Sequence, residues 1–456
     1  MASLEKNDRV KPSRSLVLLL LPLLFLIGAA VALIFLYERE APQITLVTEI
    51  ARVGRTKNLD LVLTDGKRGL RTVEAWLVQG EKKAKVFEKS YAPQGGLGLS
   101  GPARAEESFE LAPAELKFKD GEAELLVQVR DYSWWAWRQG NLAEVSFPAT
   151  IDIHPPLVRI VDSTRYIIPG GAGVVTYRIN EEVGEHGVLL NGFFHRGFPL
   201  PDKGEGVYGA VLALPYDTKL IEQSLVRAVD LAGNETRMPF GMVMRRGTKK
   251  EDRIEISDNF LGSKLPEFDS YYPELVGTPP LEQYLEINDR IRQENNAKIL
   301  EVCSHSKPER MWDGRFQRLA RSSRRAGFAE YRTYYYQGKA IDHQVHLGID
   351  LASTSQAPVK AATRGEVVFT GYLGIYGNMV ILDHGFGVFT LYSHLSQIQV
   401  EVGSPVGPET VIGLTGHTGM AGGDHLHFSV LVNGIFVNPL EWWDSQWLTL
   451  NILNYL

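Results

Sequence analysis

The stretches Val-His-Leu-Gly-Ile-Asp-Leu (residues 345–351) and His-Leu-His-Phe-Ser-Val-Leu-Val (residues 425–432) set the fold of the C-terminal part of this chain. In each, polar or small residues alternate with apolar ones, which is typical of a strand with one buried face. His346 and Asp350 then share a face, and Gly348 between them leaves that face open. His425 and His427 also share a face, because their apolar neighbours point to the other side. The alternation therefore predicts two strands that carry imidazole and carboxylate groups.

The chain between these two stretches has the same character. Strands are predicted over residues 365–372, 378–384 and 388–394, with glycine at most turns. Six of the eleven histidines lie between His346 and His427. Histidine is an uncommon choice for the core of a strand, so this clustering points to function. A single histidine can also be a hydrogen-bonded core residue, which we expect of His343, His384 and His417.

Two imidazole nitrogens and one carboxylate oxygen form a suitable three-point set for Zn²⁺. Three protein ligands leave a fourth position for water, which is the arrangement of a catalytic site. A zinc-bound water can ionise near pH 7 and so supply hydroxide. Hydrolysis of an amide also needs a proton acceptor and a group that stabilises the oxyanion. The strand that ends at His394 adds a further imidazole for these roles.

Residues from about 334 to 441 resemble the lysostaphin-like (LytM-type) zinc metallopeptidases, which cut peptide cross-links in bacterial peptidoglycan. Each motif is weak alone, but their order and spacing are highly specific. The motifs are the His346…Asp350 element, Gly377-Asn378, Tyr392-Ser393-His394-Leu395, Gly416-His417-Thr418-Gly419, His425-Leu426-His427 and Val437-Asn438-Pro439.

The resemblance implies a role for each member of the histidine cluster. His346, Asp350 and His427 would bind one zinc ion per chain. His394 and His425 would stay off the metal, as general base and transition-state stabiliser. The resemblance also implies that residues 331–445 form an antiparallel β-sheet metallopeptidase domain.

The resemblance further implies a narrow groove for peptidoglycan peptide stems. The glycine-rich segments 371–378 and 416–424 would line it, with Asn378, Tyr392 and Gly419 as candidate groove residues. One position departs from the family pattern. Many members carry an acidic residue after the His-x-His-aromatic run, where this chain has Ser429, so support for the metal ligands is expected to differ here.

The N-terminal forty residues predict a membrane anchor. Residues 16–37 contain no charged side chain, and as a helix they would span about 33 Å, against about 30 Å for the bilayer core. Four basic residues precede this stretch and two glutamates follow it, so the positive-inside rule places residues 1–15 in the cytoplasm and the bulk of the chain in the periplasm. A signal peptide cleaved after Ala30-Val31-Ala32 is the alternative, but the apolar run continues to Tyr37. We expect a single-pass inner-membrane protein.

The middle of the chain predicts three further segments. Residues 41–154 and 155–246 read as short alternating strands. The predicted strands are 59–64, 73–78, 122–130 and 143–153 in the first segment, and 158–162, 173–179, 187–190 and 224–230 in the second. Each segment carries a late Asp followed by a Gly-Asn turn, at Asp131…Gly140-Asn141 and Asp230…Gly233-Asn234. Both resemble immunoglobulin-like β-sandwich domains. Residues 247–330 change character: Thr278-Pro279-Pro280 is a helix-start signal, followed by apolar residues at helical spacing up to Cys303. We expect this segment to be a helical connector, within a chain that is mainly β.

Composition excludes several other classes of protein. The 456 residues include 48 Lys and Arg against 54 Asp and Glu, a net charge of −6 that does not suggest a nucleic-acid binder. Cys303 is the single cysteine, which excludes an intrachain disulfide, a Cys-based zinc finger and an iron–sulfur cluster. The sequence also lacks a His-Glu-x-x-His motif and a phosphate-binding loop.

These observations predict a membrane-anchored zinc endopeptidase that hydrolyses peptide cross-links of peptidoglycan in cell-wall remodelling. The anchor favours D-alanyl–diaminopimelate links over polyglycine bridges. The alternative is a catalytically silent protein of the same fold that binds and activates a cell-wall amidase. Such proteins usually lack some of the metal ligands, whereas this chain lacks none. In a third reading, the two sandwiches act mainly as a scaffold.

Overall fold

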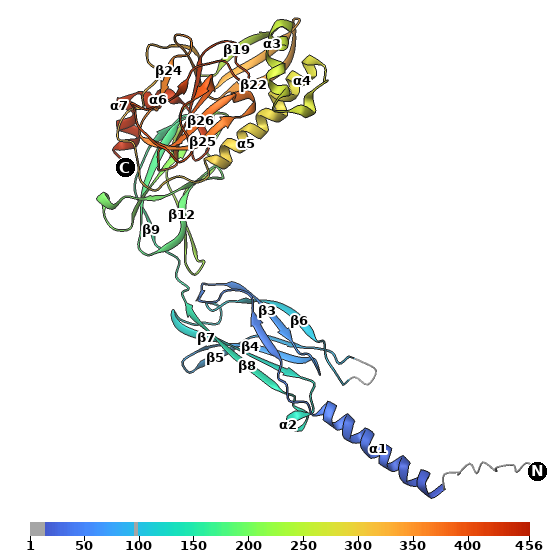
Figure 1. Cartoon of the computed structure of the whole chain (residues 1–456). Coiled ribbons are helices and arrows are strands. Elements are labelled where there is room, and N and C mark those ends of the chain that lie inside the picture. Colours follow the sequence, from blue (N-terminus) through green and yellow to red (C-terminus); the bar gives the residue numbers. More distant parts are fainter. Residues whose placement is uncertain (1–13, 95–98) are drawn as a thin grey trace, which may run out of the picture. The chain divides into compact units, whose positions relative to one another are not determined.

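The computed structural model describes residues 14–94 and 99–456, and the fold is mainly β (Figure 1). It divides into two compact units. One contains the residues up to Pro155 together with Leu231–Asn234, and the other contains Pro156–Asp230 and Glu235–Leu456.

The first unit begins with helix α1 (Arg14–Leu36). The predicted cytoplasmic tail, residues 1–15, lies outside the described residues except for its last two. The predicted membrane span, residues 16–37, falls on α1, but side chains are not described for residues 14–20. Within the part of the chain that is described, no helix is both long and apolar enough to cross a membrane.

Two sheets of the first unit share one core. Alternate side chains of β3 (Lys57–Thr64) and β4 (Leu70–Gln79) are buried in this core, which is the pattern of sheets with one solvent-exposed face. The strands predicted near residues 59–64, 73–78, 122–130 and 143–153 are β3, β4, β7 and β8. One sheet has the order β1 (Gln43–Leu46), β3 (Lys57–Thr64), β6 (Arg104–Leu111), and the other β2 (Arg52–Val53), β8 (Leu142–Ile151), β7 (Gly121–Asp131), β4 (Leu70–Gln79), β5 (Lys82–Ser90).

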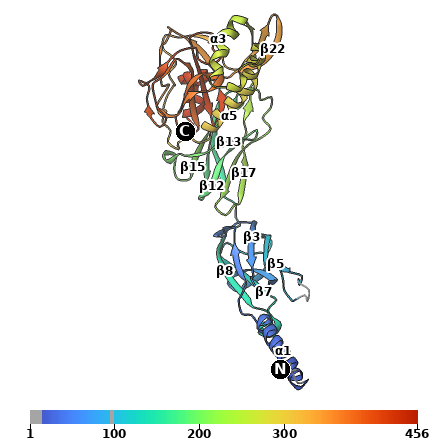
Figure 2. The ribbon, with the colours of Figure 1, turned by 45° about the vertical axis from the view of Figure 1, so that its right-hand side comes forward.

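The second unit begins with a second pair of sheets, each of four strands, drawn in green in Figures 1 and 2. They enclose a core that includes Val175, Tyr177 and Val226. The predicted strands of this segment are β9, β11, β12 and β16. The sheet orders are β14 (Phe198–Pro199), β15 (Val207–Ala213), β11 (Ala172–Ile179), β9 (Val158–Ser163) and β13 (Phe193–Arg196), β12 (Val183–Leu190), β16 (Ser224–Asp230), β17 (Glu235–Pro239).

An eight-stranded antiparallel sheet organises the rest of the second unit. The strands predicted over 365–372, 378–384, 388–394 and 425–432 are all present, as β25, β26, β27 and β31. Its order is β20 (Ser323–Ala326), β23 (Ile349–Ala352), β31 (Leu426–Val432), β27 (Val388–Leu395), β26 (Asn378–Asp383), β25 (Gly365–Tyr372), β29 (Pro405–Val406), with β32 (Ile435–Val437) paired to β31.

The two faces of this sheet pack against different parts of the unit. On the sandwich face, Phe428 and Val430 share a core with Val174 and Val211 of the second sandwich and with Trp442 near the C-terminus. On the helical face, the core contains side chains from β27, β31 and three helices. These helices, yellow in Figure 1, are α3 (Asp258–Asp269), α4 (Pro280–Glu286) and α5 (Arg292–Val302), with a π-helical turn, η3 (Ile287–Ile291), between the last two.

The prediction of a helical connector over residues 247–330 is wrong at both ends. Residues Lys250–Ile256 form β19, which pairs in parallel with β21 (Glu330–Tyr336), and β21 pairs with β22 (Lys339–His346). Residues Ser323–Ala326 form β20, an edge strand of the large sheet. Both strands are rich in charged residues, so their local pattern resembles a solvated linker, and only pairing with distant strands makes them extended.

Candidate metal and catalytic site

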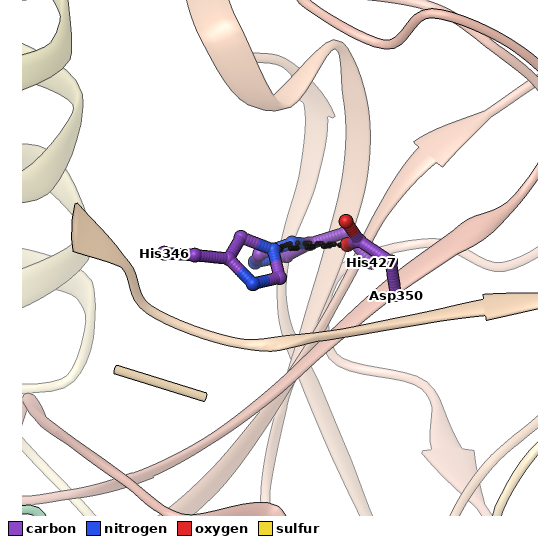
Figure 3. Close-up of side chains that lie close together, drawn as sticks. All are labelled: His346, Asp350 and His427. Atoms are coloured by element: carbon purple, nitrogen blue, oxygen red, sulfur yellow. Dashed lines mark hydrogen bonds and ion pairs between the residues drawn. The ribbon is translucent and has the colours of Figure 1, made fainter. Parts of the chain in front are cut away.

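Three strands bring the predicted metal ligands together on the helical face of the large sheet (Figure 3). His346 ends β22, Asp350 lies on β23 and His427 on β31, and Asp350 pairs directly with His427 in the sheet register. His346 Nε2 lies 3.0 Å from Asp350 Oδ1 and 2.9 Å from His427 Nδ1. The third separation, between His427 Nδ1 and Asp350 Oδ1, is 3.0 Å. Three donor atoms therefore converge on one point.

Gly348 is required for this convergence. A Cβ at residue 348 would lie 2.5 Å from His427 Nε2 and 2.7 Å from Ser429 Oγ. No side chain fits at that distance, so any substitution would push His427 out of place. The short His-x-Gly-x-Asp spacing thus leaves room for the imidazole that arrives from β31.

The charge states of the three groups suit metal binding. Burial acts to raise the pKa of Asp350, but the neighbouring imidazoles of His346, His425 and His427 hold it well below its usual range. Burial lowers the pKa of His427 to about 4. The carboxylate is thus ionised and the His427 imidazole neutral at pH 7, which are the forms that bind metals.

His394 and His425 lie beside the three ligands. The ring centroid of His394 is 4.9 Å from that of His425 and 5.7 Å from that of His427. His394 Nδ1 donates to the Thr418 carbonyl at 2.8 Å, and His425 Nδ1 to the Gly423 carbonyl at 2.8 Å. With the proton fixed on Nδ1, the neutral His394 ring keeps its lone pair on Nε2. Burial also keeps the pKa of His394 well below its usual value, so this ring is neutral at pH 7 and its Nε2 carries no proton.

Each ligand is also held from behind by a second contact. His346 Nδ1 donates to the Gly327 carbonyl at 2.8 Å, and Arg332 Nη2 lies 3.4 Å from Asp350 Oδ2. Ser429 Oγ lies 3.1 Å from His427 Nε2 and donates to the Leu347 carbonyl at 2.8 Å. Ser429 therefore accepts the Nε2 proton, and His427 presents Nδ1 to the other ligands. Ser429 therefore supports the His427 ligand at the position where the resemblance led us to expect different support.

Tyr392, one of the predicted groove residues, is in the wrong place for that role. Its side chain is 1% exposed on the sandwich face, where its hydroxyl accepts from the Ala362 amide at 2.7 Å. Tyr392 and His394 belong to one motif of the family resemblance, and period-two alternation would put them on the same face. His394 has a left-handed backbone with φ of 61°, and this turns its ring to the helical face.

The other two predicted groove residues join the glycine-rich loops to each other and to α3. The Asn378 amide nitrogen donates to Thr418 Oγ1 at 3.0 Å. The Gly419 amide donates to Glu267 Oε1 on α3 at 2.6 Å, and a Cβ on Gly419 would lie 2.4 Å from the Gly377 nitrogen. Neither residue lines the cavity at the site. The cavity wall from these loops is formed instead by Ile375, Tyr376, Met420, Ala421 and Gly422.

The cavity has a volume of about 460 Å³ and contains all five residues of the predicted metal and catalytic set. Its opposite wall comes from the segment predicted to be a connector, through Ile256, Phe260, Tyr284, Arg292 and Asn296. Lys264 on α3 also donates to the His417 carbonyl, and the Ile375 amide donates to Asn295 Oδ1 at 3.0 Å. This wall could not be predicted from the sequence, because nothing in the local pattern of residues 247–330 indicates a site.

The donor set fits a divalent metal ion. Two imidazole nitrogens and one carboxylate oxygen lie within hydrogen-bond distance of one another, although a single proton cannot bridge all three pairs. His346 Nδ1, Asp350 Oδ2 and His427 Nε2 already have protein partners. The other ligand atom of each side chain is therefore left to bind an ion.

Comparison with known proteins agrees with this geometry. Residues 344–439 match the model of peptidase family M23, so the C-terminal part of the chain is an M23 peptidase domain, as the lysostaphin-like resemblance predicted. The DD-carboxypeptidase/endopeptidase Mpg of Neisseria meningitidis serogroup B is 44% identical over 98 residues, which cover 22% of this chain and 23% of Mpg. The peptidoglycan DD-endopeptidase ShyA of Vibrio cholerae serotype O1 is 40% identical over 96 residues, covering 21% of this chain and 22% of ShyA.

Among solved structures, the catalytic domain of the antimicrobial peptidase lysostaphin from Staphylococcus simulans is 29% identical, with a TM-score of 0.25. That match covers 29% of this chain and 98% of the lysostaphin domain. The chain spans less than a quarter of the length of Mpg and ShyA, so these similarities concern the peptidase domain.

Proposed function

We propose that this protein is a zinc-dependent endopeptidase that hydrolyses peptide cross-links of peptidoglycan. The observation that carries the proposal is the convergence of His346 Nε2, Asp350 Oδ1 and His427 Nδ1, beside two further histidines in the same cavity. Mpg is named a DD-carboxypeptidase/endopeptidase and ShyA a peptidoglycan DD-endopeptidase, and these functions support the choice of substrate.

The residues of the site divide the work of amide hydrolysis. Zinc held by His346, Asp350 and His427 would polarise the scissile carbonyl and lower the pKa of an attacking water. His394 accepts a proton at Nε2, because its Nδ1 proton is held by the Thr418 carbonyl. Burial acts to lower the pKa of His425, but Asp350, whose Oδ1 lies 3.6 Å from His425 Nε2, raises it. The protonated ring would donate from Nε2 to the developing oxyanion.

We further propose that the protein works in the periplasm, held at the inner membrane by residues 16–37. The support is the absence of charge in that stretch and the excess of basic residues before it. Peptidoglycan lies on the same side of the membrane as the peptidase domain in this topology.

Digestion of purified sacculi tests the proposed function. The zinc-loaded full chain should release muropeptides with new peptide ends, read by mass spectrometry, while elemental analysis should find one zinc per chain. His394→Ala is the matched control, since it should keep the zinc and lose the cleavage. Zinc bound to wild type with no new peptide ends would contradict the proposal and favour the silent amidase activator.

A further inference from the structure

Two arginines face the cavity from opposite walls. Arg292, at the start of α5, and Arg332, on β21, both line the cavity that holds the metal and catalytic set. Neither belongs to the segment that matches the M23 family, residues 344–439. They are therefore features of this chain that the family similarity does not explain.

Arg292 is held in place by Asn288 on the preceding helical turn. Its Nε donates to the Asn288 carbonyl at 3.0 Å, and its Nη2 donates to Asn288 Oδ1. In the described part of the chain, no ion pair joins Arg292 to a carboxylate. The Tyr376 hydroxyl donates to Asn296 Oδ1 at 2.9 Å on the same helix, and the ring of Tyr376 stands 5.8 Å from that of His427. One tyrosine therefore bridges the helix that begins at Arg292 and the metal ligands.

Arg332 has a free donor on the other wall. Its Nη2 lies 3.4 Å from Asp350 Oδ2 and 3.9 Å from Glu330 Oε2. Its Nε is buried and has no hydrogen-bond partner among the described residues. A buried donor without a partner is unfavourable, and an arriving anion would satisfy it.

We propose that Arg292 and Arg332 form a binding subsite for a substrate carboxylate on the leaving side of the scissile bond. This inference rests on the proposed peptidase function and narrows its substrate class. Arginine recognises carboxylates through charge-assisted hydrogen bonds, which gain strength where water is excluded.

The chemistry of peptidoglycan stems gives such a carboxylate a definite origin. In a D-alanyl–D-alanine terminus and in a D-alanyl–diaminopimelate link, the carbon that carries the scissile nitrogen also bears a free carboxylate. An internal bond of a polyglycine bridge has an amide at that position. A pair of arginines in the cavity of the metal ligands would therefore favour bonds between two D-centres with a free carboxylate over neutral bridges.

A pair of peptides that differ only in this charge tests the subsite by binding. The ligands are diacetyl-L-lysyl-D-alanyl-D-alanine and its C-terminal carboxamide. Calorimetry on the zinc-loaded full chain carrying His394→Ala, so that nothing is cut, should give a Kd roughly 10- to 100-fold lower for the acid. Arg292→Gln in the same background should bring the two Kd values together, while Arg292→Lys should keep part of the preference.

Arg290→Gln is the matched control. Arg290 lies on the preceding helical turn, but its guanidinium is 40% exposed and pairs with Glu274, Glu286 and Glu294. This variant should keep the full preference for the acid. Zinc content and unfolding temperature should be unchanged in all the Arg292 and Arg290 variants, which excludes misfolding as the cause of a lost preference.

Cleavage of the same peptides separates this inference from the proposed function. If wild type cuts the acid with a higher kcat/KM and Arg292→Gln loses that advantage, both stand. If acid and carboxamide bind equally, or if Arg292→Gln keeps the preference, the subsite is refuted even when cleavage occurs. If the acid binds preferentially but neither peptide nor sacculi are cut, the subsite stands and the proposed peptidase function fails.

Discussion

The two faces of the eight-stranded sheet hold buried histidines that differ in the partners of their ring nitrogens. On the sandwich face, His384 Nδ1 donates to the Arg364 carbonyl at 2.6 Å and Nε2 lies 2.7 Å from Thr390 Oγ1, so both nitrogens have protein partners. On the helical face, His427 Nε2 is taken by Ser429, but Nδ1 faces two other metal-binding groups. Burial is similar, at 0% and 6% exposure, so burial does not distinguish them.

The difference lies in the ring nitrogen that the protein leaves available. A histidine with both nitrogens occupied by the protein is a core residue, whatever motif surrounds it. A histidine with one nitrogen held from behind and the other facing a cavity is prepared for a ligand or a proton. The helical face has several such groups, and the following experiments should act on the two faces differently.

The largest effect is expected from removal of a ligand on the helical face. Asp350→Ala removes the only carboxylate of the donor set and leaves His346 and His427 with two-point binding. We expect loss of zinc and a fall in kcat/KM of more than about 1000-fold, because metal-activated water is lost. Elemental analysis and muropeptide release measure both. Asp313→Asn, with its carboxylate 78% exposed, is the control, and zinc retention in Asp350→Ala would contradict the assignment.

Loss of the general base on the same face should cost less. His394→Ala should reduce kcat by roughly 100- to 10,000-fold, the usual range for a general base, with little change in zinc content. Activity and zinc content are measured separately because a general base affects only the first, whereas a metal ligand affects both. Full activity would show that His394 is not the base, and loss of zinc would make it a ligand.

Much of this contrast could be predicted from the sequence, because it depends on local patterns. Alternation predicted β25, β26, β27 and β31, and the motif order predicted the five residues that meet in the cavity. The helical wall could not be predicted in this way. Contacts such as Glu267 with Gly419 join segments about 150 residues apart, and no local period records them.

The prediction that Tyr392 lines the groove was wrong for a related reason, because it also depended on structure that a local pattern does not record. Alternation assumes an extended backbone at every residue, and the left-handed conformation of His394 interrupts it. Sequence patterns do not reveal a positive φ at a histidine. The strained residue is the proposed general base, and such conformations are often found at functional positions.

The sandwich face should respond to pH through His384. Burial lowers the pKa of His384 to about 4, against 6.5 for an unfolded imidazole. The unfolded chain therefore gains a proton as the pH falls below 6.5, whereas the folded chain does not until about pH 4. The free energy of unfolding should fall over this range by about 3 kcal/mol from this group.

Urea unfolding of wild type and His384→Gln at several pH values between 4 and 7 measures that contribution. The variant should show a weaker pH dependence and the same zinc content, since His384 has no role on the helical face. Equal pH dependence in the two proteins would contradict the assignment of His384 as a neutral core residue.

A moderate effect is expected from the support behind a metal ligand. Arg332→Met removes the contact to Asp350 Oδ2 at 3.4 Å and leaves all three ligands in place. Zinc affinity, measured by competition with a chelator, should fall by roughly 10- to 100-fold, the usual cost of losing an outer contact. Arg332→Lys should recover part of it. Unchanged affinity in Arg332→Met would mean that the contact does not position Asp350.

The smallest effect is expected at Tyr392. A position in the groove and a position on the sandwich face predict different results for its substitution. If Tyr392 lined the groove, Tyr392→Phe would change KM. Its hydroxyl instead accepts from the Ala362 amide at 2.7 Å and contacts Thr390 Oγ1 at 3.0 Å on the sandwich face. Removal of the hydroxyl should therefore lower the free energy of unfolding by about 1 kcal/mol, the usual cost of a buried hydrogen bond, and leave kcat and KM unchanged. Urea unfolding and peptide cleavage compare the two. A change in KM without a change in the free energy of unfolding would show that Tyr392 lines the groove, and would contradict its assignment to the sandwich face.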